Sequence, residues 1–197
     1  MPGEAIQHVI DAITENRRKF SAFCHALNEE QLARAVPGSM WIVRDFAAHL
    51  GTLDTALLNW FGAVPAGAVA DSSVGADGQP FDVDEFNDAQ AAARRTWTLE
   101  RVFAEAAENR RMLAALLASL TDEQIERPMH FAGDGKRAAA DIPLKLFLQG
   151  WAQHDPIHVA DMVKALPELA GDAQIAAWLD NPYVAGYQKA MNGATHG

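Results

Sequence analysis

The sequence predicts an all-α protein, a four-helix bundle with one long loop between its second and third helices. Four long stretches repeat apolar residues at the three- and four-residue spacing of amphipathic helices. No useful length of chain alternates apolar and polar residues, so no sheet is expected. Four main helices joined by connections of varied length favour a bundle. We expect one domain over residues 1–197, with a core over about 4–170 and a short helical tail.

The first predicted helix covers residues 4–27. Its apolar positions follow one helical face: Ile6, Val9, Ile10, Ile13, Phe20, Phe23, Cys24 and Leu27. Intervening polar residues are expected to face water: Glu15, Asn16, Arg17 and Arg18. Cys24 is not a candidate nucleophile, because thiols on the apolar face of a helix are usually inert.

The second predicted helix covers about residues 40–61 and follows the breaker pair Pro37–Gly38. Ile42 occupies a position where a side-chain cap is expected, so either Ser39 caps the helix or the helix starts earlier. Residues 62–80 then lose all periodicity. Loops of this length are uncommon in compact domains and are typical of lids or mobile segments.

The third helical region starts near Asp84 and is expected to break at residues 96–98. The apolar pattern then resumes and continues to Leu120. Residues 121–124 have the spacing of a capping box and open a short turn of helix.

The fourth predicted helix covers about residues 142–166 and contains Pro156. A proline ring in this position clashes with the carbonyl of Ala152, so the helix must kink or restart there. We expect a restart with Asp155 as the cap and Pro156 as the first helical residue.

Charge and composition exclude several classes of protein. The chain has 16 Lys+Arg against 26 Asp+Glu, a formal net charge of −10, and no basic stripe that could neutralise phosphates. Its one cysteine excludes an intrachain disulfide. The first residues do not resemble a signal peptide, and no apolar run reaches the roughly 20 residues of a spanning helix. We expect a cytoplasmic protein with no nucleic-acid or membrane partner.

Two histidines of the fourth predicted helix have the spacing of metal ligands. His154 and His158 are four residues apart, so they share a helix face. Spacing alone is a weak signal, because two partly buried or surface histidines are the commoner explanation. Apolar residues flank this pair on both sides, and unpaired imidazoles near a core are costly unless a metal satisfies them. Pro156 leaves the distance between the two imidazoles open.

A third histidine, His49, lies in a comparable place on the second predicted helix, and facing helices of a bundle bring such ligands together. Three protein ligands leave one position open for water or substrate, as in catalytic sites. Imidazoles suit zinc, which we expect first, and also nickel or iron. Asp45 and Asp161 either orient the ligand imidazoles or are solvated helix charges.

Several of these motifs occur together in one known family. Trp41 is followed eight positions later by His49, and the last long helix carries His-x-x-x-His. Residues 84–87 and 94–95 are similar to an Asp/Asn/Arg pattern of some relatives. The chain thus resembles the DinB/YfiT-like superfamily over about residues 5–170. These metal-binding four-helix bundles are unrelated to the DNA polymerase that shares the name.

The resemblance implies that His49, His154 and His158 are a metal triad for a divalent ion. It also implies a use: in thiol-transferase members the metal holds a low-molecular-weight thiol as the thiolate that attacks an electrophile. We therefore expect a metal-dependent thiol transferase acting on small molecules. A metal-dependent hydrolase, in which the metal lowers the pKa of a water, and a non-catalytic metal-binding or stress-response bundle are the alternatives. A homodimer is expected from the family as well.

Mycothiol-dependent maleylpyruvate isomerases resemble this chain but depart from it at two points. They have Glu where this chain has His154, and they carry a further C-terminal domain. About 30 residues follow Leu166, which we expect to leave no room for that domain. Isomerase activity is therefore not expected, whereas use of a thiol stays open.

Other candidate residues have simpler explanations. Trp60 and Trp151 either line a pocket near the metal or, as is more common for aromatic residues at helical spacing, belong to the core. Arg94 and Arg95 either contact carboxylates of an anionic thiol or form a solvated face. The remaining histidines are expected on the surface or in loops: His8, His25, His130 and His196.

Overall fold

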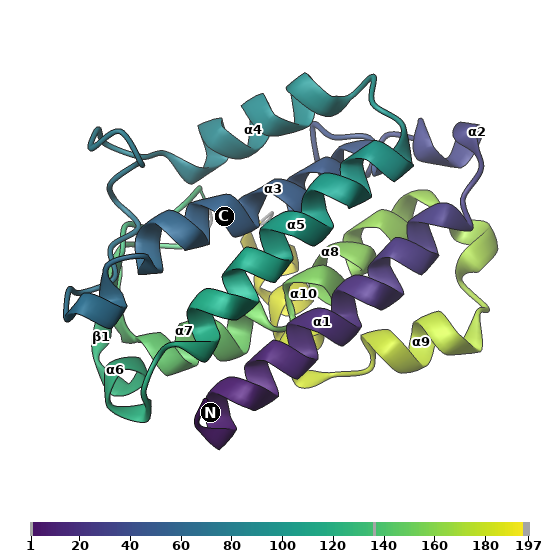
Figure 1. Ribbon diagram of the computed structural model, residues 1–197. Helices are drawn as coiled ribbons and strands as arrows, with labels where there is room; N and C mark the ends of the chain where they lie inside the picture. The colour runs from purple at the N-terminus through teal and green to yellow at the C-terminus, as the bar shows by residue number, and fades with distance from the viewer. Residues whose placement is uncertain (1, 136, 195–197) are drawn as a thin grey trace.

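The computed structural model describes residues 2–135 and 137–194. Four helical segments form the predicted bundle, the fourth in two pieces (Figure 1). These are α1 (Glu4–His25), α3 (Val43–Phe61), α5 (Leu99–Ala118), and the pair α7 (Leu144–Trp151) and α8 (His154–Met162). A further helix, α4 (Val83–Arg94), packs along the outer side of α3. The all-α bundle is therefore confirmed in its main elements.

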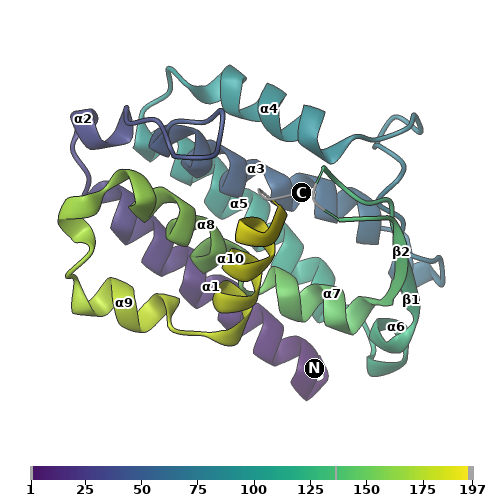
Figure 2. The same cartoon turned by 180° about the vertical axis from the view of Figure 1, so that it is seen from behind.

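Shorter elements connect and extend the bundle. They are α2 (Glu29–Leu32), η1 (Val64–Ala66), α6 (Asp122–Glu126), η2 (Val163–Ala165), η3 (Pro167–Leu169), α9 (Ala173–Leu179) and α10 (Pro182–Ala194). In Figure 2, α10 stands in front of α8, and the two helices are in contact. The predicted helical tail thus folds back over the bundle, on the side formed by α8. Asp172 caps α9, and the Asn181 side chain accepts the backbone N–H of Val184 in the first turn of α10.

Local capping explains where the helices begin. The hydroxyl of Thr98 accepts the backbone N–H of Arg101, which starts α5 after the predicted interruption. A cap at Ser39 was one of the two alternatives for the start of α3, but the hydroxyl of Ser39 instead accepts the backbone N–H of Trp41. Helix α3 begins one residue after Ile42, whose backbone N–H donates to the Asp45 carboxylate at 3.1 Å. The helix therefore starts later than predicted and relies on this carboxylate.

The fourth helix breaks between α7 and α8, as Pro156 requires. The restart comes earlier than predicted, because Gln153 is the residue before the helix and His154 is its first residue. Pro156 is thus the third residue of α8, in the first turn, where a missing N–H costs little. Its absent N–H leaves the carbonyl of Ala152 free, and this carbonyl accepts a hydrogen bond from Asn16 Nδ2 at 2.7 Å.

A two-stranded hairpin corrects the expectation that the chain contains no sheet. Strands β1 (Pro128–Phe131) and β2 (Ala140–Pro143) pair antiparallel, with His130 opposite Asp141. Each strand has four residues, too few for a period of two to be distinguished from chance. The fourth helical segment consequently begins at Leu144, and Ile142, its predicted first residue, belongs to β2.

Residues 62–80 form the predicted long loop, with η1 as its one helical turn. Hydrogen bonds tie the loop to β1: His130 donates its N–H to the carbonyl of Ala70, and Ser72 donates to the carbonyl of His130. The loop follows the end of α3 that is about 18 Å from His49, at 1.5 Å per helical residue. In Figure 1 the hairpin lies at this end of α3, so the loop begins three helical turns away from His49.

The core consists of two apolar clusters separated by a buried polar layer. One cluster includes Ile13, Leu57, Leu113 and Leu148, and the other is built around Phe20 and further residues of α3, α5 and α8. Every segment of the bundle contributes polar residues between the clusters: Asn16, Arg17, His49, Thr52, Asp54, Asn109, Arg110, Asp155 and His158. The prediction that Asn16 and Arg17 face water is therefore wrong.

Within the described residues, no helix combines the length and the apolar character needed to cross a membrane.

The hairpin generates a prediction about the titration of His130. A hydrogen bond with Asp141 at 2.8 Å raises the pKa of His130 above its ordinary value, and the charge of Asp71 adds to this effect. Because the pKa is raised, the pair contributes its full stabilisation of the hairpin at a pH below the unfolded-state pKa of His130, near 6.5. This contribution is lost as the pH rises through the folded-state pKa. In an NMR titration, Asp141→Asn should lower the midpoint of His130. Glu126→Gln, which alters a carboxylate bound to Lys145, is the control and should leave it unchanged.

Candidate metal centre

Three histidines from two segments of the bundle meet at one point. His49 lies in the second turn of α3, and His154 and His158 lie one turn apart on α8. The Nε2 atom of His158 is 3.3 Å from that of His49 and 3.1 Å from that of His154. All three ligand atoms lie within 4.8 Å of one another. The structure therefore brings together the three histidines that the sequence predicted as a triad.

The donor set fits a divalent ion better than it fits hydrogen bonds among the rings. A neutral imidazole has one N–H and one lone pair, so three nitrogens directed at one point cannot all be matched by each other. Zinc–nitrogen bonds of about 2.0–2.1 Å in tetrahedral geometry place two neighbouring nitrogens about 3.3 Å apart. The observed separations of 3.1 and 3.3 Å agree with that spacing.

Aromatic rings surround the triad. The ring of Trp151 stacks on that of His154 at 4.3 Å, and the ring of Trp41 lies 4.9 Å from His49. Phe46 lies 5.4 Å from His158, and Tyr187 of α10 approaches the same imidazole. His49 and His158 are buried, whereas His154 is partly exposed. The triad thus lies among aromatic rings, and His154 is its one residue with partial exposure.

This environment keeps His154 neutral. Burial lowers the pKa of His154 well below its ordinary value, and the neighbouring imidazoles of His158 and His49 lower it further. A neutral imidazole is the form that binds a metal, so the site presents this ligand ready for coordination at ordinary pH.

Two aspartates were predicted as partners of the ligands. Asp161 Oδ2 lies 3.6 Å from Nδ1 of His158, and Asp161 also accepts hydrogen bonds from Lys164 and Gln188. Burial alone would raise the pKa of Asp161, but the contacts with His158 and Lys164 outweigh it and lower the pKa below its ordinary value. An ionised carboxylate beside His158 favours a proton on Nδ1 and leaves Nε2 free for a metal.

Asp45 has a different set of contacts. Its fully buried carboxylate accepts hydrogen bonds from Arg95 at 3.0 and 2.7 Å and from the backbone of Ile42. These contacts fix the start of α3 one turn before His49. Asp45 is therefore not a solvated helix charge, which was one of the two alternatives; the other, that it orients the imidazole of His49, stays a prediction.

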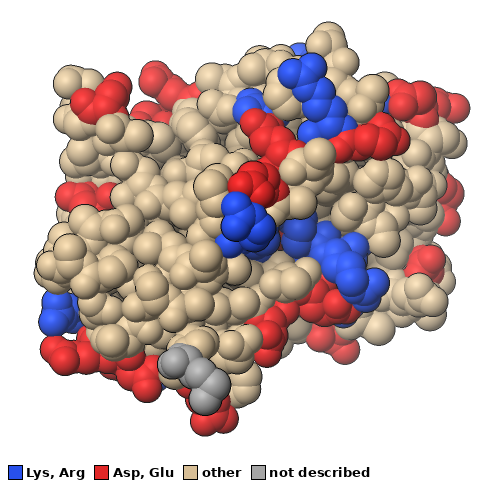
Figure 3. All heavy atoms as spheres, in the orientation of Figure 1, with Lys and Arg blue, Asp and Glu red and all other residues tan. Residues whose placement is uncertain are grey.

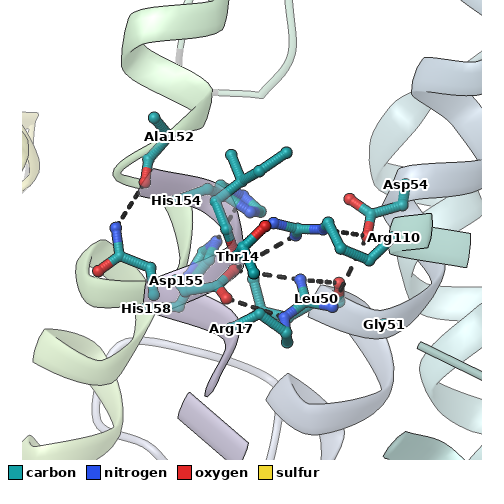
Figure 4. Close-up of polar contacts among 12 residues, drawn as sticks. Thr14, Arg17, Leu50, Gly51, Asp54, Arg110, Ala152, His154, Asp155 and His158 are labelled. Atoms are coloured by element: carbon teal, nitrogen blue, oxygen red, sulfur yellow. Dashed lines mark hydrogen bonds and ion pairs between the residues drawn. The ribbon is translucent and has the colours of Figure 1, made fainter. Parts of the chain in front are cut away.

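A buried ion cluster lies beside the triad and was not predicted from the sequence (Figure 4). Arg17 of α1 donates from Nε and Nη2 to the Asp155 carboxylate at 2.8 and 3.2 Å. Arg110 of α5 donates to Asp54 of α3 at 2.7 Å, and it donates to the carbonyl of Ile13 at 2.8 Å. Two arginines and two aspartates therefore form a neutral cluster that links all four segments of the bundle.

On the surface, oppositely charged residues pair within one helix, whereas the buried cluster joins different helices. Figure 3 shows the face formed by α1 and α5, where basic and acidic side chains alternate over the middle of the molecule. Arg18 pairs with Glu15 and Arg111 pairs with Glu108, each three residues apart on one helix. No extended basic surface forms on this face.

The remaining candidates have structural roles. Arg94 pairs with Glu105 at 2.6 Å, so both predicted arginines already have carboxylate partners. Trp60 packs against Phe81 and Phe147 in the core, three helical turns from His49, whereas Trp151 belongs to the triad's surroundings.

Cys24 is fully buried, as predicted from its place on the apolar face of α1, and burial raises the pKa of its thiol. His8 and His25 are exposed on α1 as expected, while His130 lies on β1 rather than in a loop. His196 lies outside the described residues.

Fold and site together define a four-helix bundle that carries three convergent histidines on two of its segments. The sequence matches the DinB superfamily over residues 12–162, and the chain belongs to this superfamily. The matched stretch includes all three histidines and both arginines of the buried cluster. No curated protein matches the sequence.

Two solved structures share the fold. A mycothiol-dependent maleylpyruvate isomerase superposes with a TM-score of 0.59 at 11% identity, over 80% of this chain and 60% of that chain. A mutant of the same isomerase, in which alanine replaces one histidine, gives a TM-score of 0.58 at 10% identity with the same coverage. The chain thus spans about three fifths of the isomerase's length, and likeness at this identity shows the fold alone.

The buried cluster generates a prediction about stability. Arg110→Met removes the cation that donates to Asp54 and leaves a buried carboxylate short of a partner, which should lower the free energy of unfolding by about 3 kcal/mol. Urea denaturation followed by circular dichroism measures the loss. Arg111→Met is the matched control: this neighbouring arginine is exposed and pairs with the exposed Glu108, so its replacement should leave the free energy of unfolding nearly unchanged. Equal losses in both variants would contradict a buried, coupled cluster.

Proposed function

We propose that the protein binds one divalent metal ion through His49, His154 and His158 and works as a metal-dependent transferase that activates a low-molecular-weight thiol for attack on an electrophile. The observation that carries the proposal is the convergence of the three imidazoles: His158 Nε2 lies 3.3 Å from that of His49 and 3.1 Å from that of His154, and one of the three residues, His154, is partly exposed. Zinc is the expected ion, and nickel and iron suit the same imidazoles. Membership of the DinB superfamily supports a metal site at these residues.

Three neutral ligands favour an anion in the open position. Imidazoles bring no negative charge, so a divalent ion held by them keeps its full charge in surroundings of low polarity. When bound, the ion would supply Lewis acidity that lowers the pKa of a thiol and holds it as the nucleophilic thiolate. The rings of Trp41, Phe46 and Trp151 lie against the three histidines, and aromatic surroundings of this kind suit a polarisable sulfur.

The use of a thiol is supported by the kind of enzyme that shares the fold. The solved structures that superpose on this chain are of an isomerase whose name states its dependence on mycothiol. This chain covers only part of that enzyme, so the isomerisation itself is not proposed here. We propose that this chain likewise uses a small thiol, at the site formed by its own three histidines.

A hydrolase is the second candidate, because the same three-ligand site would lower the pKa of a bound water. A non-catalytic metal-binding bundle is the third, and the burial of His49 and His158 favours it, since a closed site is typical of structural metals. The partial exposure of His154 favours catalysis over that alternative. The product of a reaction distinguishes all three.

Metal content gives the first test. Purified wild-type protein should contain about one equivalent of zinc, nickel or iron by plasma mass spectrometry, and His154→Ala should lose most of it because two imidazoles remain. His8→Ala removes an exposed histidine of α1 and should retain the wild-type content. Metal saturation at about 100 times the dissociation constant should also raise the free energy of unfolding by about 2.7 kcal/mol. Wild-type protein that stays metal-free after incubation with each ion would refute the site.

Turnover gives the second test. With zinc-loaded protein, a small thiol such as mycothiol, glutathione or cysteine and an aromatic halide, the sulfur should bond to the ring carbon. Halide should leave with the bonding electron pair, and the thiol proton should pass to solvent. Absorbance follows the thioether, and the rate should fall at least about tenfold in His154→Ala but not in His8→Ala. Halide release without thioether would indicate the hydrolase, and metal binding without either product would indicate a non-catalytic bundle.

A further inference from the structure

One guanidinium group contacts both segments that carry the histidines. Arg17 lies on α1, which contributes no ligand, and is buried in the polar layer. Its Nη2 donates to the carbonyl of Leu50 at 2.6 Å, while Nε and Nη2 donate to the Asp155 carboxylate at 2.8 and 3.2 Å. Figure 4 shows Arg17 between Leu50 on one side and Asp155 on the other.

The two contacted residues are the direct sequence neighbours of two histidines. Leu50 follows His49 on α3, and Asp155 follows His154 at the start of α8. Arg17 therefore connects the backbone of α3 directly after His49 with the side chain of the residue directly after His154. Its contacts can be changed by substitution without altering any of the three histidines.

The beginning of α8 needs such an external restraint. Pro156 removes one hydrogen bond between α7 and α8, and no side chain caps the first turn at Gln153. The carbonyl freed by the proline is held from the same helix as Arg17, since Asn16 donates to Ala152 at 2.7 Å. Two adjacent residues of α1 thus hold the turn that carries His154.

We propose that Arg17 is a positioning residue for the triad: by bridging Leu50 and Asp155 it sets the distance between His49 and His154 and thereby the affinity and geometry of metal binding. The inference rests on the proposed metal site. A guanidinium suits this task because its planar fork donates in fixed directions to a carboxylate and a carbonyl at once. A lysine ammonium carries the same charge without that geometry.

The test uses full-length protein with Co²⁺ and Zn²⁺ as probes. Arg17→Met removes charge and bridge, Arg17→Lys retains the charge, and Arg18→Met alters the neighbouring exposed arginine as the matched control. Zn²⁺ affinity is measured by competition with a chromogenic chelator, at a temperature where circular dichroism shows each metal-free variant to be folded. The visible spectrum of the Co²⁺ form reports ligand geometry, and thermal unfolding of the metal-free form reports stability separately.

We expect Arg17→Met to weaken Zn²⁺ binding by about 10- to 100-fold and to shift the Co²⁺ spectrum. Arg17→Lys should recover part of the affinity, and Arg18→Met should match the wild type. A folded Arg17→Met protein with wild-type affinity and spectrum would overturn the proposal even if its melting temperature fell, because the role would then be structural.

Two further outcomes are decisive. If Arg17→Met does not fold, Arg17→Lys decides: wild-type affinity and spectrum in that variant overturn the proposal, and weakened binding with a shifted spectrum supports it. If the wild type binds none of Co²⁺, Zn²⁺, Ni²⁺ and Fe²⁺, the proposed metal site fails, and the role of Arg17 fails with it.

Discussion

The structure depends on burying two arginines and two aspartates at one level of a four-helix bundle. Removing four charges from water costs several kcal/mol per ion unless each finds a partner in good geometry. Arg17 and Arg110 meet this demand with Asp155 and Asp54 and with two backbone carbonyls, so the cluster is neutral. Its partners come from all four segments, and it therefore fixes how far each helix is shifted along its neighbours.

The break in the fourth helix is held by residues of α1 next to the ion cluster and within it. Pro156 frees a carbonyl that Asn16 satisfies from α1, and the restart at His154 gives Asp155 the position from which it meets Arg17. The proline was a reason to doubt the triad, because a kink could have separated the two imidazoles of this segment. In the structure the kink falls before His154, so both imidazoles stay on one continuous turn, 3.1 Å apart at Nε2.

Much of the fold could be predicted from the sequence because helical periodicity and caps are local signals. The triad could be predicted because His154 and His158 share a local spacing and the family motif adds His49. The ion cluster could not be predicted, since Arg17 and Asp155 are 138 residues apart in the sequence and charged residues are by default expected on the surface. A signal was nevertheless present: Arg17 lies four residues after Ile13 and three before Phe20, on the apolar face of its helix.

Stability alone does not account for such a cluster. Replacing a buried ion pair by well-packed apolar residues is often neutral or stabilising, and the two flanking apolar clusters show that this bundle packs such residues readily. What apolar side chains cannot provide is a directional contact, such as that of Arg17 with the Leu50 carbonyl and the Asp155 carboxylate, which holds two helices at one separation. A metal centre with ligands from two segments needs that separation held to about 0.5 Å. The charges lie beside the histidines because the helices must be held in register at that level.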